Sequence, residues 1–244
     1  MSDADTAPMA RAVLHDGWGE LVLDRPQRRN ALVGPMVTQL RAGLAELQVA
    51  GVRVILLRGE GGVFCSGLDV DAFAQRPAPA WRASWPEDWF AFHRDLHACP
   101  AVIVGALEKY AINGGASLAM ACDLLVAGQG AQLFVGEAAQ GMHAPMNIAW
   151  LTLRTTPAVA AQLALGALRT PATELHRLGL VYDLVADDEV AAAARGDAER
   201  LAGFPGQGLA AIKASLRKAS LAAGEAVFDA ARATDIVTAG PSRI

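Results

Sequence analysis

A single carboxylate stands where it could transfer a proton. Glu137 directly follows a short apolar segment that ends at Val135, and the residues on either side of it are small or apolar. A carboxylate in such surroundings is partly desolvated, which raises its pKa toward the range that general acid–base catalysis needs. The alternative is an ordinary acidic residue in the first turn of a helix, where the helix dipole favours negative charge.

Two glycine-bearing turns could supply hydrogen-bond donors to an anion. They are Phe64-Cys-Ser-Gly-Leu-Asp69 and Asn113-Gly-Gly-Ala-Ser117, and each follows a buried strand and precedes a helix. Small residues let a ligand approach the backbone. Free N–H groups at the start of a helix carry partial positive charge and stabilise a developing oxyanion. Taken singly, each turn also has a structural explanation, which is an Asp69 N-cap for the first and close backbone packing for the second.

The elements that must position these residues alternate between short strands and helices. Strands are predicted at 11–15, 20–25, 52–57, 102–107, 123–127 and 131–135, and helices at 35–49, 89–98 and 115–122. The continuous apolar run 52–57 is typical of a strand buried on both faces. Residues 77–86 are irregular, and Trp81, Trp85 and Trp89 are expected either in the core or in a lid over a pocket. From Pro157 onward the chain is predicted to be almost entirely helical. Strand-strand-helix units in series predict an α/β fold of stacked sheet layers with helices outside.

Composition excludes several classes of protein. The 244 residues are 53% hydrophobic and 19% charged, which is enough for a large core without staples. A formal net charge of -4 and only three lysines leave no basic surface for nucleic acid. The three cysteines are far apart and odd in number, so we expect reduced, mostly buried thiols in a cytoplasmic protein. We expect neither a signal peptide nor a membrane span.

Taken together and in this order, the segments resemble the crotonase (enoyl-CoA hydratase/isomerase) superfamily. The segments that carry the resemblance are Leu23-Asp-Arg-Pro26 with Asn30-Ala-Leu32, VILLRGEGGVFCSGLDVDAF, AINGGASLAMACDLLVAG, Ala131 to Gly141, and LGALRTPATELHRLGLVYDLV. The resemblance implies a crotonase-like spiral of strand-strand-helix units over residues 11–189. A helical C-terminal region, 190–244, would mediate trimer contacts, and residues 1–10 would form a flexible tail.

The resemblance also implies roles for individual residues. The backbone N–H groups of Leu68 and Gly114 would form an oxyanion hole for a thioester enolate, and Glu137 would be the acid/base. Arg28 and Arg29 fall where the family's chain passes the CoA nucleotide, although a solvated basic turn is the alternative for their side chains. The other residues expected to bind substrate are Ser66, Gly67, Asp69, Gly115, Ser117 and His143. The ligand would be an acyl-CoA with CoA as part of the substrate, so we expect no separate cofactor and no metal.

Ser117 stands where hydratases of this family carry a second glutamate. Two carboxylates share the work of hydration, whereas moving a double bond needs one base that removes a proton and returns it. A serine without a partner is not a strong base at neutral pH. The sequence therefore predicts isomerisation of an enoyl-CoA double bond, with 2-enoyl-CoA hydration as the alternative.

Two further segments depart from the family's pattern. In hydratases a proline and a run of glycines follow the catalytic glutamate, whereas Gly141-Met-His-Ala-Pro-Met-Asn147 would place bulkier residues on the pocket floor. His143 is a second candidate for proton transfer, or else a pocket-wall or surface histidine. The end of the chain, 238–244, stops short of the family's last helix, which helps to cover CoA. Weak CoA affinity, or help from a neighbouring subunit, is expected.

Functions from other classes remain open at this point. Gly115-Ala-Ser117 resembles a serine-hydrolase nucleophile turn, although sequence cannot supply the geometry of a triad. A non-catalytic acyl-CoA-binding scaffold is the other alternative. The predicted C-terminal helices carry apolar residues that imply burial against a neighbour, and hence a homotrimer or a hexamer. These residues are Leu201, Phe204, Leu209, Ile212, Leu216, Val227 and Phe228.

Overall fold

The computed structural model describes residues 8–220 and 228–229. The strands are β1 Ala10–Leu14, β2 Trp18–Leu23, β3 Val54–Gly59, β4 Val102–Leu107, β5 Tyr110–Ile112, β6 Leu124–Gly128, β7 Gln132–Phe134, β8 Thr170–Pro171 and β9 Asp183–Val185. The α-helices are α1 Gly34–Val49, α2 Val70–Ala74, α3 Trp85–Ala98, α4 Gly114–Ala121, α5 Pro145–Arg154, α6 Pro157–Gly166, α7 Ala172–Arg177, α8 Val190–Ala202 and α9 Gly206–Ser220. Short 3-10 helices are η2 Pro26–Arg28, η3 Ala80–Arg82 and η4 Ala138–Gln140.

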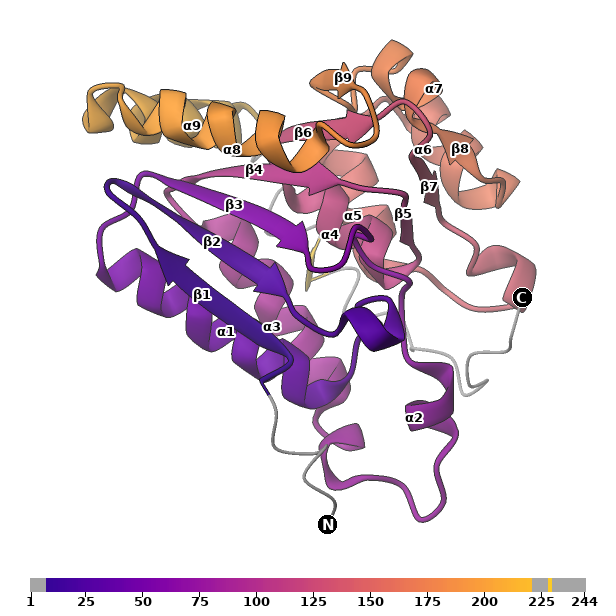
Figure 1. Ribbon diagram of the computed structural model, residues 1–244. Helices are drawn as coiled ribbons and strands as arrows, with labels where there is room; N and C mark the ends of the chain where they lie inside the picture. The colour runs from indigo at the N-terminus through magenta and orange to yellow at the C-terminus, as the bar shows by residue number, and fades with distance from the viewer. Residues whose placement is uncertain (1–7, 221–227, 230–244) are drawn as a thin grey trace.

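Two sheets organise these elements (Figure 1). The larger has the strand order β1-β2-β3-β4-β6-β9, in which β1 and β2 pair antiparallel and every later pair is parallel. The smaller has the order β5-β7-β8, with β5 and β7 parallel. The mixed sheet with helices on both faces confirms the predicted α/β class.

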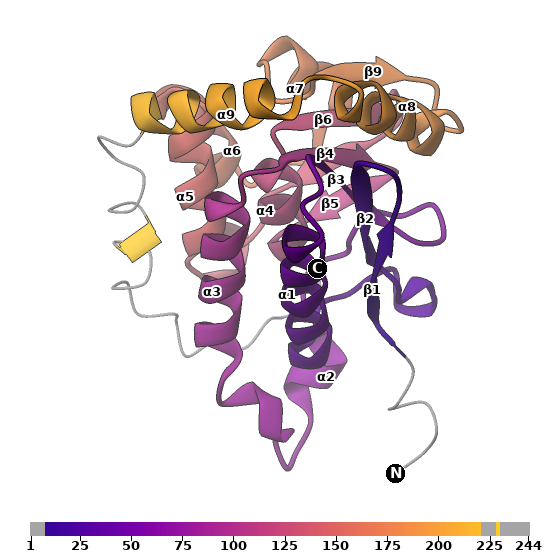
Figure 2. The ribbon, with the colours of Figure 1, turned by 90° about the vertical axis from the view of Figure 1, so that its left-hand side faces the viewer.

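Helices cover both faces of the larger sheet, so its central strands are buried on both sides. On β3, Val54 and Leu56 pack in one core cluster with α8, whereas Ile55 and Leu57 pack in the other with α1 and α3. Figures 1 and 2 show α1 and α3 on one side of this sheet and α8 on the other. Alternate side chains of a strand point to opposite faces, which is why the continuous apolar run is needed here.

The prediction of a helical chain beyond Pro157 is wrong at two places. Residues of β8 pair antiparallel with β7, and β9 adds to the edge of the larger sheet beside β6. Both strands are very short, and their pairing partners lie far away in the sequence. A local pattern therefore carries little of the signal that decides these strands.

The tryptophan-bearing segment is partly helical, and two of its three tryptophans lie in the core, as one of the two expectations had it. Helix α3 begins at Trp85, earlier than predicted, because Pro86 is tolerated in the first turn of a helix. Trp85 and Trp89 are buried and stack with ring centroids 5.4 Å apart, and Phe73 contacts Trp85 edge-on. Both tryptophans also line the cavity described below.

Other features of the described chain bear on the sequence predictions. The three cysteines are free and buried, as predicted. None of the helices described over 8–220 is long and apolar enough to cross a membrane. Helix α5 and strand β5 were not predicted, and both contribute to the site.

Candidate active site

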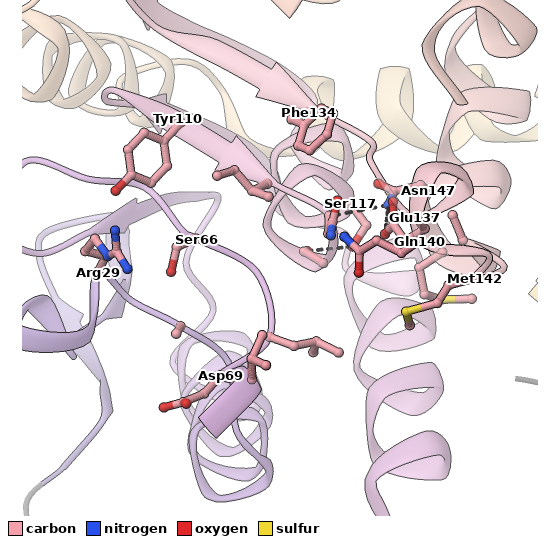
Figure 3. Close-up of a pocket in the computed structure, with 18 of the residues that line it drawn as sticks. Arg29, Ser66, Asp69, Tyr110, Ser117, Phe134, Glu137, Gln140, Met142 and Asn147 are labelled. Atoms are coloured by element: carbon pink, nitrogen blue, oxygen red, sulfur yellow. Dashed lines mark hydrogen bonds between the residues drawn. The ribbon is translucent and has the colours of Figure 1, made fainter. Parts of the chain in front are cut away.

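A cavity of about 740 Å³ brings most of the predicted site residues together (Figure 3). Those that line it are Arg28, Arg29, Ser66, Leu68, Asp69, Gly114, Ser117, Glu137 and His143. Gly67 and Gly115 are not part of the lining. In Figure 3, Glu137, Ser117 and Asn147 lie at one end, and Arg29 and Tyr110 lie at the other.

The two glycine-bearing turns are held side by side by their backbones. The Cys65 N–H donates to Tyr110 O at 3.2 Å, and the Ile112 N–H donates to Cys65 O at 3.1 Å. A Cβ atom on Gly115 would lie 2.7 Å from Cys65 O, and one on Gly67 would lie 2.8 Å from Ile112 O. Both glycines are therefore required for the close approach of the turns, behind the cavity wall.

Leu68 and Gly114 both line the cavity, and their amides are unpaired within the described chain. Among the described residues, neither N–H has a hydrogen-bond acceptor. Gly114 is the first residue of α4, where a helix leaves its N–H groups without intrahelical partners. The Asp69 N–H, by contrast, donates to Leu32 O at 3.0 Å. Unpaired backbone amides on a cavity wall are the kind of donor that an oxyanion hole needs.

Asn113 immediately precedes the Gly114 amide and has a conformation that favours glycine. Its φ is 51° and its ψ is -112°, a combination that costs about 1–3 kcal/mol for a residue with a Cβ atom. Its N–H donates to Phe134 O at 2.7 Å, and its Oδ1 accepts from the Gly136 N–H at 2.8 Å. These contacts tie the start of α4 to the chain that leads into Glu137.

Glu137 is buried, and only one of its two carboxylate oxygens accepts a hydrogen bond from another side chain in the described part of the protein. Its Oε1 accepts a hydrogen bond of 2.8 Å from Asn147 Nδ2, whereas its Oε2 is buried and has no partner among the described residues. Burial raises the pKa of Glu137 to about 7, although hydrogen bonds from its own backbone N–H and from Asn147 partly lower it. A carboxyl group with this pKa can both take and return a proton near neutral pH.

Ser117 is committed to a buried hydrogen-bond chain. The Trp150 Nε1–H donates to His93 Nδ1 at 2.8 Å, so His93, whose pKa burial lowers to about 3, is neutral with its proton on Nε2. That Nε2–H lies 3.3 Å from Ser117 Oγ, and Ser117 Oγ–H donates to Gly114 O at 2.7 Å. His93 therefore cannot accept the hydroxyl proton, and the geometry does not support Ser117 as a hydrolase nucleophile.

Asp69 is the predicted N-cap, and it also organises the basic turn. Its carboxylate accepts from the Ala72 N–H at 3.1 Å and pairs with Arg25 at 2.7 Å and Arg28 at 3.5 Å. Burial alone would raise the pKa of Asp69, but these donors hold it below its usual value. The Asp69 side chain is thus a structural group of the turn that carries Leu68.

Two other arginines at the cavity carry free positive charge. Within the described chain, neither Arg29 nor Arg169 has a carboxylate within 4 Å. The guanidinium of Arg169 lies 5.1 Å from the centroid of the Phe134 ring. These two cations can attract an anionic part of a ligand.

His143 lines the cavity, and its buried Nδ1 has no partner among the described residues. It is thus a pocket-wall histidine with one ring nitrogen left unsatisfied. The expectation that bulky residues occupy this wall is confirmed, because Met142 and Met146 line it as well.

Sequence reasoning assigned no individual role to Asn147 and missed His93, Trp150 and Arg169, the last of which lines the cavity. Asn147 is on α5, His93 is on α3 and Trp150 is on α5, and all three are buried. For Asn147 and His93, the sequence signal is a polar side chain on the apolar face of a helix. This pattern identifies the helix, but it does not show which other element that face meets.

Comparisons with known proteins identify a family. Residues 15–235 match the family model described as Enoyl-CoA hydratase/isomerase. The chain is 35% identical to human "Enoyl-CoA hydratase domain-containing protein 2, mitochondrial", over 76% of this chain and 64% of that protein. It is 29% identical to "1,2-epoxyphenylacetyl-CoA isomerase" of Escherichia coli strain K12, over 82% of this chain and 78% of that protein. Among solved structures, a Thermobifida fusca YX protein in complex with CoA is similar, with a TM-score of 0.77, 29% identity, and coverage of 92% of this chain and 91% of that chain.

Proposed function

This chain belongs to the enoyl-CoA hydratase/isomerase family, and from that premise we propose that it moves the double bond of an enoyl-CoA thioester. Glu137 is the acid/base, and the N–H groups of Leu68 and Gly114 bind the thioester oxygen. No separate cofactor or metal takes part, because CoA arrives as part of the substrate.

The mechanism uses one proton and one base. The Glu137 carboxylate removes a proton from the carbon next to the thioester of a 3-enoyl-CoA. The electron pair spreads over the diene and the thioester oxygen, which accepts hydrogen bonds from the two amides. Glu137 then returns the proton to the far end of the dienolate, leaving a 2-enoyl-CoA. Atoms and charge balance without water or a second acid.

The observation that carries this proposal is the state of Glu137. One of its oxygens is held by Asn147, and the other is buried and unpaired. Burial raises its pKa to about 7, where the protonated and ionised forms are close in free energy. The same carboxyl group can then both remove the proton and return it.

Ser117 favours isomerisation over hydration. Its hydroxyl hydrogen is used by Gly114 O, and its oxygen faces His93 Nε2–H. Both hydrogen-bonding capacities of the Ser117 hydroxyl are therefore used within the protein. This position offers no second carboxylate to align a water molecule for hydration.

The two ends of the cavity favour different parts of an acyl-CoA. Arg29 and Arg169 offer uncompensated positive charge for the phosphates of CoA. Near the amide of Gly114 the wall is aromatic, because a Cβ atom on Gly114 would lie 3.5 Å from Trp89. An apolar acyl group fits this wall better than a charged one.

The test is isomerisation of trans-3-hexenoyl-CoA in heavy water. Wild-type protein should produce 2-hexenoyl-CoA, and deuterium that the Glu137 carboxyl takes up from the solvent should appear at C4, the carbon that receives the returned proton. Mass spectrometry locates the label. Glu137→Gln keeps size and hydrogen bonding but removes the base, so the rate should fall about 100- to 10,000-fold while acyl-CoA binding persists. Glu46→Gln makes the same change at an exposed site on α1 and is the control. An active Glu137→Gln enzyme would contradict the assignment of the base.

A second comparison separates isomerase from hydratase. Ser117→Glu restores a second carboxylate and should raise hydration of crotonyl-CoA above the wild-type rate. Wild-type hydration faster than isomerisation of the 3-enoyl substrate would instead favour the hydratase alternative.

We also propose that copies of this chain associate through α9. Ile212 and Leu216 on this helix are 61% and 66% exposed, and Phe204 just before it is 43% exposed. Leu201 and Phe228, expected at the same surface, are instead buried within the chain, and Val227 lies outside the described residues. Light scattering at micromolar concentration should give a trimer or hexamer, and a monomer would contradict the proposal.

A further inference from the structure

Asn147 contacts both halves of the proposed catalytic apparatus. Its side chain is 2% exposed. One Nδ2 hydrogen points to Glu137 Oε1 at 2.8 Å, and Nδ2 also donates to Asn113 O at 3.1 Å. Both partners are acceptors, which fixes the orientation of the amide, because a flipped side chain would face them with an oxygen.

The Asn113 carbonyl belongs to the same peptide unit as the Gly114 N–H. That unit is planar, and in a trans peptide its C=O and N–H point in opposite directions. A hydrogen bond that holds the oxygen therefore also holds the direction of the N–H. It further polarises the peptide, which strengthens the N–H as a donor.

We propose that Asn147 is a positioning residue that locks the Glu137 base and the Gly114 oxyanion donor into one geometry through the two hydrogens of a single amide group. This inference rests on the proposed function. Asn147 acts through Glu137 and the Asn113–Gly114 peptide, and it needs no contact with substrate.

A purely structural role does not account for this residue. Asn147 Oδ1 is buried and has no partner among the described residues, so this amide retains a desolvation cost that an apolar residue would avoid. Neighbouring positions on α5, such as Leu151, fill the core with apolar side chains. A buried polar group that is only partly satisfied is expected at a functional site rather than in a helix core.

Few charged groups face Glu137. A change in the pKa of Glu137 on replacing Asn147 can therefore be attributed to the lost hydrogen bond. Helices α4 and α6, strand β7 and η4 carry no titratable side chain. Helix α5 carries Arg154, whose electrostatic partners are Asp123 and Cys122. The loop before α5 brings His143, and α3 brings His93, which stays neutral behind Ser117. Arg169 stands beyond Phe134.

The expected change has a definite direction. The Asn147 hydrogen bond stabilises the ionised carboxylate and so lowers the pKa of Glu137. The base must be ionised to act, so kcat/KM should rise with pH through that pKa. Asn147→Leu, which has a similar shape and no donor, should move the midpoint of this rise by about one pH unit to higher pH.

The experiment measures kcat/KM and kcat for trans-3-hexenoyl-CoA against pH, together with the dissociation constant of hexanoyl-CoA. In Asn147→Leu, kcat should fall about 10- to 100-fold, while the dissociation constant changes little. Leu151→Ala is the matched control, because it removes buried volume from the same helix without touching Glu137. It should lose stability and keep the wild-type pH profile.

A second variant guards against loss of folding. If Asn147→Leu does not give folded protein by circular dichroism, Asn147→Ala replaces it, since an alanine side chain has no hydrogen-bond donor and serves neither acceptor. The same displacement to higher pH supports the inference. A wild-type midpoint in the folded variant overturns it.

Failure of the inference and failure of the proposed function are distinguishable. If Glu137→Gln is inactive and the Asn147 variants keep the wild-type profile, only the inference is wrong. If Glu137→Gln stays active, the proposed function is wrong, whatever the Asn147 variants do.

Discussion

The buried ionisation of Glu137 should cost the protein stability, and the cost can be measured without any substrate. Burial raises the pKa of Glu137 from 4.5 to about 7. Between these values the native state binds more protons at this site than the unfolded state. The free energy of unfolding therefore falls as pH rises from about 4.5 to about 7, and this contribution is constant outside that window.

The size of this loss of stability follows from the interval between the two pKa values. Each pH unit in the interval corresponds to about 1.4 kcal/mol, so the full loss approaches about 3 kcal/mol. About 2.5 kcal/mol of it falls between pH 5 and pH 8. Glu137→Gln removes the ionisation while keeping the shape of the side chain. Relative to wild type, the variant should gain about that much stability over this range.

Urea unfolding followed by circular dichroism at pH 5 and pH 8 measures the difference. Glu46→Gln, the same substitution at an exposed position of α1, should follow the wild-type pH dependence closely. If Glu137→Gln and wild type change in parallel between the two pH values, Glu137 does not ionise in a buried site and the reasoning is wrong.

Three further predictions concern the framework of the site. Trp150→Phe leaves His93 Nδ1 unpaired and should lower the free energy of unfolding by about 1–3 kcal/mol; an unchanged value in urea unfolding would contradict the hydrogen-bond chain to Ser117. Gly67→Ala should cost more than Gly179→Ala in the same assay, because φ is positive at both (87° and 79°) but only the Cβ atom at 67 would meet a neighbour, Ile112 O at 2.8 Å. Equal losses would mean that the turns need no close approach. Lys213→Met removes hydrogen bonds of 2.6 Å to Asp123 and Ala101 O and should cost about 1–3 kcal/mol, with faster hydrogen exchange in α9; exchange at the wild-type rate would show that other contacts dock this helix.

The sequence alone was sufficient for the family and for the candidate base and oxyanion donors of the site. The apolar run of β3 identified a strand buried on both faces, since such a strand needs apolar residues at every position. The glycines of the two turns and the isolated Glu137 marked the candidate oxyanion hole and the candidate base. These features are local, and their spacing along the chain carries the information.

Only the tertiary structure decided how those groups are satisfied. Asn147, His93 and Trp150 come from two helices, and their importance lies in partners on other elements that no local pattern specifies. Ser117 read as a possible nucleophile until His93 was found to present a proton to it. Strand β9 was missed for the same reason, because its hydrogen-bonding partner β6 is remote in sequence. Hydrogen bonds and desolvation depend on what packs against a group in three dimensions, and this is why the pKa of Glu137 could be given a direction from the sequence but needed the fold to reach about 7.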